Sequence, residues 1–484
     1  MTDLPLWFDP ALLFIGGQWS PSATDETLPV IDPSTGVEIA RIARGGKADI
    51  AAAVIAAETA LAGAWGAMPA FERGRILSRL GMLVLDHVDA LAEMEARDVG
   101  KPLRQARNDV IALARYCEFY GGAADKLHGQ TIPFQAGFTV YTMREPHGVT
   151  GHIIPWNYPM QILGRSIGAA LATGNACVLK PAEEACLTAL AFADLARQAG
   201  FPPGALNVVP GLGLEAGAAL TANPGIRHLS FTGSVATGRH VQIAAAENIV
   251  PVTLELGGKS PQLVFADADL DRALPFLVNA GIQNAGQTCS AGSRILVQRS
   301  IHDQLAVRLA SAINALKVAP AMDDADVGPL VSARQKSIVE SFLAKATSGQ
   351  ILAQAPLPAG LPRGGNYIAP TLIGHIPPDH PLAQDEIFGP VQVLIPFDDE
   401  DDAIRIANGT KYGLVASVWS ADGGRQMRLA KRLHAGQVFL NNYGAAGGVE
   451  LPFGGTGHSG HGREKGFEAL YAFTALKTVA AWHG

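Results

Sequence analysis

The chain has 484 residues, of which 48% are hydrophobic and 17% are charged, and its formal net charge is −7. This length exceeds one hydrophobic core, so we expect two or three packed lobes, and the acidic balance excludes the basic surface that nucleic-acid binding requires. No stretch reaches the ~18 to 20 apolar residues of a membrane span, and Met1 to Pro5 lack the pattern of a secretion signal, so we expect neither membrane insertion nor export.

The first predicted elements are helices. Residues 47–128 are rich in Ala, Leu, Glu and Arg and carry apolar residues at helical spacing. The segment from Thr139 to Pro146 then alternates between polar and apolar residues and ends at proline, which indicates an exposed strand that pairs with a neighbour.

Short apolar runs alternate with helical stretches between Val149 and Leu256. The predicted strands cover residues 149–154, 176–179, 205–209, 228–231 and 252–256. Strands separated by helices of roughly 10 to 15 residues favour parallel βαβ units, the architecture of nucleotide-binding sheets. A second alternating block from Ser260 to about Phe439, with strands at 293–298 and 391–397, predicts a second α/β lobe. Leu470 to Ala481 is predicted to be a final strand.

Two glycine-containing turns follow predicted strands. Gly211 to Gly217 has the spacing G-x-G-x-x-x-G, which is not a dinucleotide fingerprint, and we interpret it as a turn and helix start. Gly233 to Gly238 is G-x-x-x-x-G between a strand and a helix, where backbone N–H groups can face a pyrophosphate, although an ordinary tight turn is equally consistent. Residues 355–365 are predicted to be a surface loop.

Four cysteines occur, at positions 117, 177, 186 and 289, without metal-ligand or disulfide-rich spacing. We therefore expect a reducing cytoplasmic compartment, no metal site, and a Cys289 that is free to react. Cys289 lies in Asn284–Ser290, some thirty positions after the acidic segment Leu254–Pro261. A thiol nucleophile and a carboxylate base are the groups that catalysis through a thioester requires. A lone cysteine is more often a small buried hydrophobe, and Glu255 could simply end a strand.

Further segments accompany this pair: Ile153–Pro159, Lys180–Glu183, Phe231–Ser234, Glu386–Pro390 and Pro452–Gly455. In this order the seven segments closely resemble the NAD(P)-dependent aldehyde dehydrogenase superfamily, from about Phe14 to Val479. The resemblance implies an α/β fold with a Rossmann-type cofactor domain, a second α/β catalytic domain and a small oligomerisation β-arm. It assigns residues 1–125 and 147–256 to NAD binding, 257–460 to catalysis, and 126–146 with 461–484 to a homodimer or homotetramer.

The resemblance also implies cofactor contacts. Gly233 and Ser234 would hold the diphosphate, Lys180 and Glu183 the adenosine ribose, and Glu386 the nicotinamide ribose. Ile153, Pro155, Trp156, Leu256 and Phe388 complete the expected cofactor site. A carboxylate at Glu183 would repel a 2′-phosphate, so NAD is expected over NADP, although some relatives with this residue accept both. From composition alone, Lys180 and Glu183 could also be a solvated charge pair.

The implied chemistry begins with the Cys289 thiolate. Hydride does not leave a planar aldehyde, but addition of the thiolate gives a tetrahedral thiohemiacetal that expels hydride to the nicotinamide and leaves a thioester. The Asn157 side-chain amide and the Cys289 N–H would form an oxyanion hole worth ~3 to 4 kcal/mol per donor. Asn157 could instead satisfy its own turn. Glu255 is the expected general base for the thiol and for the hydrolytic water.

The implied substrate pocket contains Tyr158 and Phe453 as aromatic walls, with Thr288 and Ser290 beside the nucleophile. Arg165-Ser166 stands where many relatives have Trp-Lys. Arg165 either meets a carboxylate or hydroxyl of the substrate, as in similar semialdehyde and lactaldehyde dehydrogenases, or extends outward and pairs with an acidic side chain. The small residues of Tyr443–Val449 predict a roomier mouth for a bulky, aryl or carboxylated aldehyde, unless they serve loop geometry.

Two other functions compete with this interpretation. One is a coenzyme A-acylating aldehyde dehydrogenase, a branch that lacks the base equivalent to Glu255. The other is an inactive structural or binding protein of the same fold, as some lens crystallins are. Cys289, Glu255 and Asn157 together favour the hydrolytic enzyme. His458 and His461 are predicted to be surface or turn residues.

Overall fold

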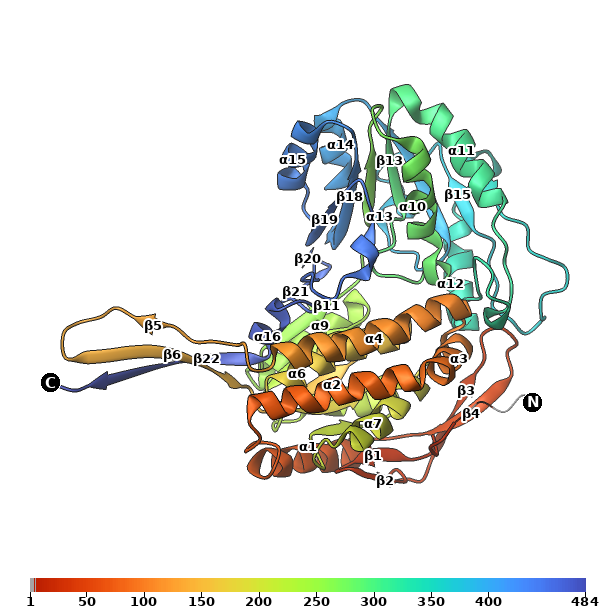
Figure 1. The fold of residues 1–484 in the computed structure, drawn as a ribbon. Helices are drawn as coiled ribbons and strands as arrows, with labels where there is room; N and C mark the ends of the chain where they lie inside the picture. Colours follow the sequence, from red (N-terminus) through yellow and green to blue (C-terminus); the bar gives the residue numbers. More distant parts are fainter. Residues whose placement is uncertain (1–3, 5) are drawn as a thin grey trace.

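Two sheets of mainly parallel strands organise the chain, and each has its own hydrophobic core (Figure 1). The computed structural model describes residue 4 and residues 6–484. Met1, Thr2, Asp3 and Pro5, which belong to the N-terminal segment considered above, lie outside the described residues. Within the part of the chain that is described, no helix is both long and apolar enough to cross a bilayer.

The first sheet contains the five parallel strands predicted between residues 149 and 256. In spatial order they are β9 (Leu206–Val208), β8 (Ala176–Lys180), β7 (Val149–Ile153), β10 (His228–Thr232) and β11 (Val252–Glu255). Antiparallel edge strands extend it: β1 (Leu13–Ile15), β2 (Gln18–Ser20) and β21 (Gly460–His461). The chain winds outward from β7 in one direction and then returns to β10. The crevice at the carboxyl ends of β7 and β10 is therefore a topological switch point, where such sheets bind ligands.

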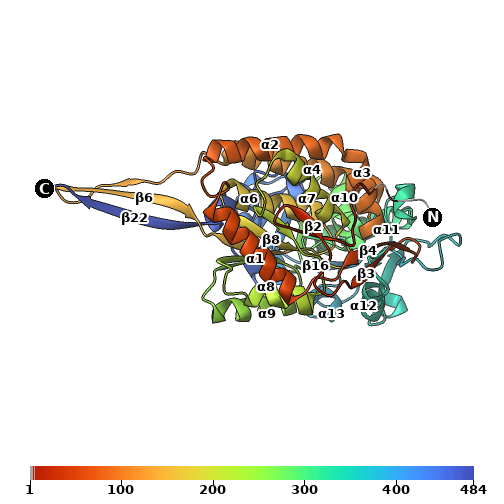
Figure 2. The same ribbon diagram turned by 90° about the horizontal axis from the view of Figure 1, so that it is seen from below.

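Helices cover both faces of this sheet. Figure 2 shows α2 (Ala70–Asp86) and α4 (Leu103–Ala123) on one side and α8 (Ala218–Ala222) and α9 (Val235–Glu247) on the other. The remaining helices of this lobe are α1 (Lys47–Ala62), α3 (Val88–Val99), α5 (Pro159–Ile162), α6 (Gly168–Ala172) and α7 (Leu187–Ala199). The prediction of helices in residues 47–128 is confirmed. A hairpin of β3 (Thr27–Ile31) and β4 (Glu38–Ala43) precedes them.

The second sheet confirms the predicted second α/β lobe. Its spatial order is β14 (Ile351–Gln354), β15 (Thr371–Ile373), β16 (Val391–Phe397), β13 (Arg294–Gln298), β12 (Pro261–Val264), β18 (Val415–Trp419) and β19 (Gln437–Leu440). All neighbours are parallel except β14 and β15. Its helices are α10 (Leu270–Ile282), α11 (His302–Asn314), α12 (Ala333–Leu343), α13 (Pro381–Gln384), α14 (Glu400–Ala407) and α15 (Gly423–Arg432).

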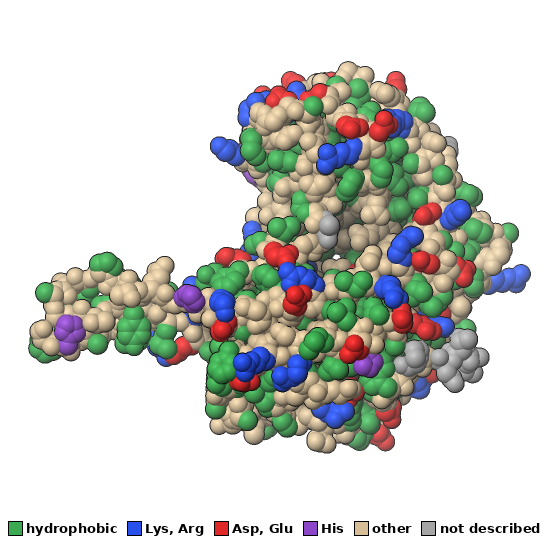
Figure 3. All heavy atoms as spheres, viewed as in Figure 1, with side chains coloured by type: hydrophobic (Ala, Val, Ile, Leu, Met, Phe, Trp, Pro, Cys, Tyr) green, Lys and Arg blue, Asp and Glu red, His purple; other side chains and the backbone are tan. Residues whose placement is uncertain are grey.

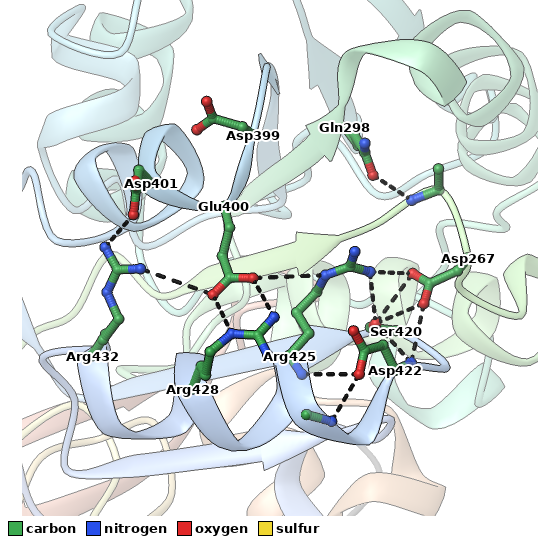
Figure 4. A network of polar contacts seen from close by, with 12 residues as sticks. Asp267, Gln298, Asp399, Glu400, Asp401, Ser420, Asp422, Arg425, Arg428 and Arg432 are labelled. Atoms are coloured by element: carbon green, nitrogen blue, oxygen red, sulfur yellow. Dashed lines mark hydrogen bonds and ion pairs between the residues drawn. The ribbon is translucent and has the colours of Figure 1, made fainter.

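A network of charged residues fastens α15 to its neighbours (Figure 4). Arg428 donates two hydrogen bonds, of 3.0 and 2.9 Å, to the Glu400 carboxylate of α14. Arg425 donates a 2.8 Å hydrogen bond to Asp267, which follows β12. α15 is mostly polar, so these bonds hold it where apolar packing is sparse.

The β-arm projects from the body (Figure 1). It contains β5 (Thr131–Ile132), β6 (Phe138–Pro146) and β22 (Thr474–Trp482), and β6 pairs antiparallel with β22 along its whole length. The predicted strand from Leu470 is wrong at its start, because residues 470–472 belong to α16 (Glu468–Ala472). Leu470 and Phe473 are both buried, and their spacing of three residues suits one face of a helical turn. A short ladder of β17 (Tyr412–Gly413) and β20 (Thr456–Gly457) lies between the lobes.

Candidate active site

A cavity of about 1120 Å³ lies at the carboxyl ends of the first sheet and faces the second lobe. Figure 3 shows the body hollowed between the two lobes. The cavity is lined by all three predicted catalytic residues, Asn157, Glu255 and Cys289. It is also lined by most of the predicted cofactor and substrate residues: Pro155, Trp156, Tyr158, Arg165, Gly233, Ser234, Leu256, Thr288, Ser290, Glu386, Phe388 and Phe453. Ile153, Lys180 and Glu183 lie outside its lining.

A strained turn presents Cys289. After α10 the backbone enters the left-handed region at three consecutive residues, Asn284 (φ 50°), Ala285 (φ 54°) and Gly286 (φ 73°). A Cβ on Gly286 would lie 2.1 Å from the Gly389 carbonyl oxygen, so this close approach requires glycine. The turn is held by its neighbours, because the Gln287 side chain accepts from Val331 N at 2.9 Å. Such strain persists where the surroundings fix it, typically at functional sites.

Burial distinguishes Cys289 from the other thiols. Cys117, Cys177 and Cys186 are buried, whereas Cys289 is half-buried at the cavity, beside Leu414, Val415 and Phe453, and all four are free. Burial raises the pKa of the Cys289 thiol to about 12, although the Arg165 charge opposes this rise. The thiol therefore keeps its proton at neutral pH in this state, and a base must remove it.

Glu255 is the base predicted for that task, and it lines the same cavity. It ends β11 and is buried, and neither carboxylate oxygen has a hydrogen-bond partner among the described residues. Burial, together with the nearby Glu464 charge, raises the pKa of Glu255 well above its usual value. A Cβ on Gly454 would come within 2.7 Å of Glu255 Oε1, so that glycine leaves room for the carboxylate. A buried, unpartnered carboxyl in a cleft is the environment of a general base.

Asn157 is held by residues far away in the sequence. Its Nδ2 donates to the Gln287 carbonyl at 2.9 Å, and its own carbonyl accepts from Asn284 Nδ2 at 2.9 Å. The alternative in which Asn157 satisfies its own turn therefore does not describe this side chain. An amide nitrogen carries two protons, so the second remains available to an oxygen in the cavity.

Arg165 occupies a place that neither sequence interpretation described fully. It lies in a π-helical turn, Leu163–Ile167, between α5 and α6, and its side chain is buried. The guanidinium Nε lies 2.5 Å from a Glu464 carboxylate oxygen, and Nη2 donates to Thr232 Oγ1 at 3.3 Å. The expected acidic partner is present, but Arg165 reaches it inside the protein, so the interpretation in which the side chain extends outward is wrong. Glu464 neutralises the charge of Arg165, although Arg165 lines the cavity.

A chain of buried hydrogen bonds holds Glu464. Ser230 Oγ donates to Glu464 Oε1 at 2.6 Å, and Ser166 Oγ donates to Ser230 at 3.0 Å. His152 Nδ1 lies 2.7 Å from Ser166 Oγ, and Thr150 Oγ1 lies 2.8 Å from His152 Nε2. Because each hydroxyl donates toward the carboxylate, His152 must carry its proton on Nδ1 and accept from Thr150. Burial lowers the pKa of His152 to about 3, which keeps the ring neutral.

The sequence analysis did not predict this series of hydrogen bonds, although the sequence contains a signal for it. Thr150 and His152 alternate in a predicted buried strand, and His228 and Ser230 do the same in the adjacent one. Polar side chains at alternate positions of a parallel strand that is buried on both faces require partners across the sheet.

The predicted cofactor residues lie along the same edge. Ile153 ends β7, and Lys180, which ends β8, donates to Glu183 at 2.6 Å. Ser234 caps α9 by accepting from Thr237 N at 3.2 Å, at the end of the predicted glycine turn. Lys180 and Glu183 therefore form an ion pair, but the lysine is buried and not solvated.

Glu386 and Phe388 lie on the opposite wall of the cavity. Gly258 N donates to Glu386 Oε1 at 3.0 Å, and burial raises the pKa of Glu386 to about 7. The rings of Phe388 and Trp156 meet edge to face with centroids 5.4 Å apart. Two carboxylates can accept from ribose hydroxyls, and the N–H groups of one helix N-terminus can donate to a diphosphate, so these groups fit a dinucleotide.

The substrate side holds two lysines that the sequence did not single out. Lys101 is fully buried, donates to Glu95 at 2.7 Å, and has its Nζ 4.0 Å from the centre of the Tyr158 ring. Tyr158 Oη in turn lies 3.0 Å from Thr288 Oγ1, so the wall next to Cys289 is fixed. Lys465 follows Glu464 and lines the cavity, whereas Lys101 lies behind Tyr158, outside the lining. Among the described residues, no group of three or more His, Cys, Asp or Glu could hold a metal ion.

Comparisons with known proteins agree with this geometry. The model of the aldehyde dehydrogenase family matches residues 19–479. A hydroxyisobutyraldehyde dehydrogenase from Mycolicibacterium austroafricanum is 41% identical over 473 residues, which cover 97% of this chain and 93% of that protein.

Solved structures are similar as well. A crystal structure from Burkholderia cenocepacia, provisionally named an aldehyde dehydrogenase, is 63% identical with a TM-score of 0.97 and covers 98% of this chain and 100% of that one. The NAD+ complex of an aldehyde dehydrogenase from Bacillus cereus is 37% identical with a TM-score of 0.95, covering 98% of this chain and 97% of that one.

Proposed function

Since the chain belongs to the aldehyde dehydrogenase family, we propose that it oxidises an aldehyde to the carboxylic acid through a covalent intermediate on Cys289, with NAD as the acceptor. The observation that carries this proposal is one cavity that holds a half-buried thiol, a side-chain amide and a buried carboxyl with no hydrogen-bond partner among the described residues. These are the groups that acyl chemistry on a thiol requires.

The first step is the addition of sulfur. Glu255 takes the thiol proton, directly or through water, and the Cys289 thiolate attacks the carbonyl carbon. The electron pair of the C=O bond moves to oxygen, where the free N–H of Asn157 and the Cys289 backbone N–H stabilise it. NAD, when bound, supplies the acceptor for the hydride that leaves this carbon. The product on the enzyme is a thioester.

The second step is hydrolysis. After passing the thiol proton to solvent, Glu255 removes a proton from water, the water oxygen attacks the thioester carbon, and the C–S bond breaks to release the acid and the Cys289 sulfur, which takes that proton from Glu255. A carboxyl with a raised pKa suits both proton transfers, because it holds a proton more tightly than an exposed glutamate does. Glu255 is also the feature that favours hydrolysis over thiolysis by coenzyme A.

Most of the proposed cofactor contacts line the same cavity, and Ile153, Lys180 and Glu183 lie beyond its lining. Gly233 and Ser234, at the N-terminus of α9, would hold the diphosphate, and Glu183 and Glu386 the two riboses. Ile153, Pro155, Trp156, Lys180, Leu256 and Phe388 complete this proposed NAD site. Glu183 disfavours the 2′-phosphate of NADP, but its pairing with Lys180 softens that repulsion, so NAD is preferred without excluding NADP.

The proposed domains keep the boundaries predicted from the sequence. Residues 1–125 and 147–256 bind the cofactor, residues 257–460 form the catalytic domain, and residues 126–146 with 461–484 associate subunits. Separate hydrophobic cores in the two lobes support it. The arm, which extends from the body, supports a homodimer or homotetramer. Four free cysteines support a reducing, cytoplasmic location.

Stopped-flow fluorescence with NAD and a panel of aldehydes tests the central proposal. Wild-type protein should give a burst of NADH equal to the number of active sites and should release free acid without coenzyme A. Cys289→Ala should give no burst. Glu255→Gln should accumulate a mass-detectable thioester and lose roughly 10² to 10⁴ in turnover. Full turnover by Cys289→Ala contradicts the mechanism, and product formation only with coenzyme A favours the acylating alternative.

A further inference from the structure

Positively charged side chains gather on the substrate side of the cavity, and one of them lacks a carboxylate of its own at ion-pair distance in the described part of the chain. Three cations lie around Phe453 and Glu450. Arg165 is paired with Glu464 at 2.5 Å, and Arg115 is paired with Glu450 at 2.5 Å. Lys465 has no carboxylate within 4 Å among the described residues, and its hydrogen-bond partner is the Gly447 carbonyl at 3.2 Å.

The position of Lys465 brings its charge into the cavity. The side chain is half-buried and lines the same cavity as Cys289. Its ammonium lies 6.0 Å from the centre of the Phe453 ring, and the Arg165 guanidinium carbon lies 5.0 Å from the same centre. Two cations that converge on one ring repel each other, and burial adds to that cost unless an anion joins them.

The backbone at Lys465 is also unusual. Its φ of 64° lies in the left-handed region, which glycine adopts most easily. Lysine at such a position costs conformational energy, and such residues cluster at ligand sites. Gly444 and Gly447 line the cavity, and a Cβ added to either would meet nothing within 4 Å. Because the Gly447 carbonyl accepts from Lys465, these two glycines leave open space in the loop that contacts the ammonium.

We propose that Lys465 is a specificity-determining residue that binds an anionic group, a carboxylate in the first instance, at the far end of the aldehyde substrate. The inference rests on the proposed function and names its substrate class. It also reassigns the role that the sequence suggested for Arg165, whose charge Glu464 already neutralises. The substrate would be a semialdehyde, with its aldehyde carbon at Cys289 and its carboxylate at Lys465.

The alternative is a purely structural lysine that ties its own loop to Gly447. Lys465→Gln separates the two roles, because glutamine keeps a donor for the Gly447 carbonyl and removes the charge. Lys465→Arg keeps the charge. The substrates are unbranched aldehydes of increasing length, each in a form with a terminal carboxylate and a form with a terminal methyl group.

The readout is the ratio of kcat/KM for the carboxylated aldehyde to that for its methyl counterpart. The wild-type ratio should exceed one at the best chain length, and Lys465→Gln should lower it by roughly 10- to 100-fold, the range of a charge-assisted hydrogen bond. The loss should appear mainly in KM, with little change for the neutral aldehydes. Lys465→Arg should keep the preference.

A pH series adds an independent readout. Burial and the Arg165 charge lower the pKa of Lys465 to about 8, and the Glu450 charge opposes this fall only in part. The wild-type preference should therefore fall as the pH rises past about 8, whereas the Lys465→Arg preference should persist.

Two results overturn the proposal: a wild-type ratio near one at every chain length, or an unchanged ratio in Lys465→Gln. Both leave the proposed function intact as long as neutral aldehydes still give the NADH burst. Absence of the burst with every aldehyde is the separate failure of the proposed function.

Discussion

At the scale of single residues, burial decides what each charge in this cleft can do. Cys289 and Glu255 share one cavity, and burial raises the pKa of both groups, so each binds its proton more tightly than an exposed group of its kind does. Arg165 is the cation that opposes both rises. Because Glu464 holds Arg165 in place, a residue outside the catalytic set shapes the electrostatics of that set.

The Arg165 and Glu464 pair should be strongly coupled. Arg165→Met leaves a buried carboxylate without its cation and should lower the free energy of unfolding by ~3 to 5 kcal/mol. Adding Glu464→Gln to Arg165→Met should recover part of that loss. Denaturant unfolding of the two single variants and the double variant measures the coupling.

An exposed ion pair gives the matched control. Arg299 and Asp398 lie 2.5 Å apart with side chains 60% and 64% exposed, so Arg299→Met should cost at most ~1 kcal/mol. Equal losses in Arg165→Met and Arg299→Met would show that Glu464 does not depend on its buried partner.

At the scale of elements, a side chain of one helix satisfies a backbone N–H at the start of another helix. Asp98, near the end of α3, accepts from Leu187 N, the first residue of α7, at 3.0 Å. This bond satisfies a backbone donor that a helix start otherwise leaves free. Asp98 is fully buried, and burial raises its pKa from 3.8 to about 8. The neutral carboxyl therefore belongs to the folded protein.

The sign of the pH effect follows from that raised pKa. The folded protein binds the Asp98 proton more tightly than the unfolded chain does, so the stability from this group is complete below about pH 3.8 and is lost as the pH rises to about 8. Asp98→Asn keeps an acceptor for Leu187 N but cannot ionise. Between pH 5 and 8, the free energy of unfolding of Asp98→Asn should therefore fall less steeply than that of the wild type. The two slopes should differ by up to ~1.4 kcal/mol per pH unit.

Urea unfolding at a series of pH values measures how the free energy of unfolding of each protein changes with pH. A destabilisation by the substitution that is the same at every pH does not affect this comparison. Asp303→Asn is the control, because that side chain is fully exposed, at 101% of the reference area. If the Asp98→Asn slope matched the wild-type slope, the carboxyl would be ionised in the fold.

At the scale of the whole molecule, the arm exposes apolar side chains that the monomer does not cover. On β22, Leu476 is 57% exposed and Trp482 is 73% exposed, and Tyr141 and Met143 of β6 are exposed as well. Two strands that project from the body bury little apolar area on their own, so they gain most from a second subunit.

Charge on the arm should therefore weaken association. The double variant Leu476→Glu and Trp482→Glu should shift sedimentation at micromolar concentration from a dimer or tetramer toward the monomer. The unfolding transition of the two lobes should not change. Leu214→Glu is the control, since Leu214 is 93% exposed and lies away from the arm. A wild-type monomer at that concentration would remove the basis of the proposed assembly.

The sequence predicted most elements because their signals are local. The apolar runs at 149–154 and 228–231 became β7 and β10 within a residue at each end, since strands buried on both faces need uninterrupted apolar or small residues. The start of β22 was misplaced because a short apolar run such as Leu470 to Phe473 suits a strand and a helical turn equally well.

The sequence by itself determined the fold class, the family and the candidate nucleophile, base and amide, because motif order and residue type record them directly. The tertiary structure alone decided which charges are free. Arg165 and Lys465 are both cations near the substrate, but Glu464 meets the first at 2.5 Å and no described carboxylate lies within 4 Å of the second. The physical reason is that ion pairing depends on distance and burial between residues some 300 positions apart, which spacing along the chain does not encode.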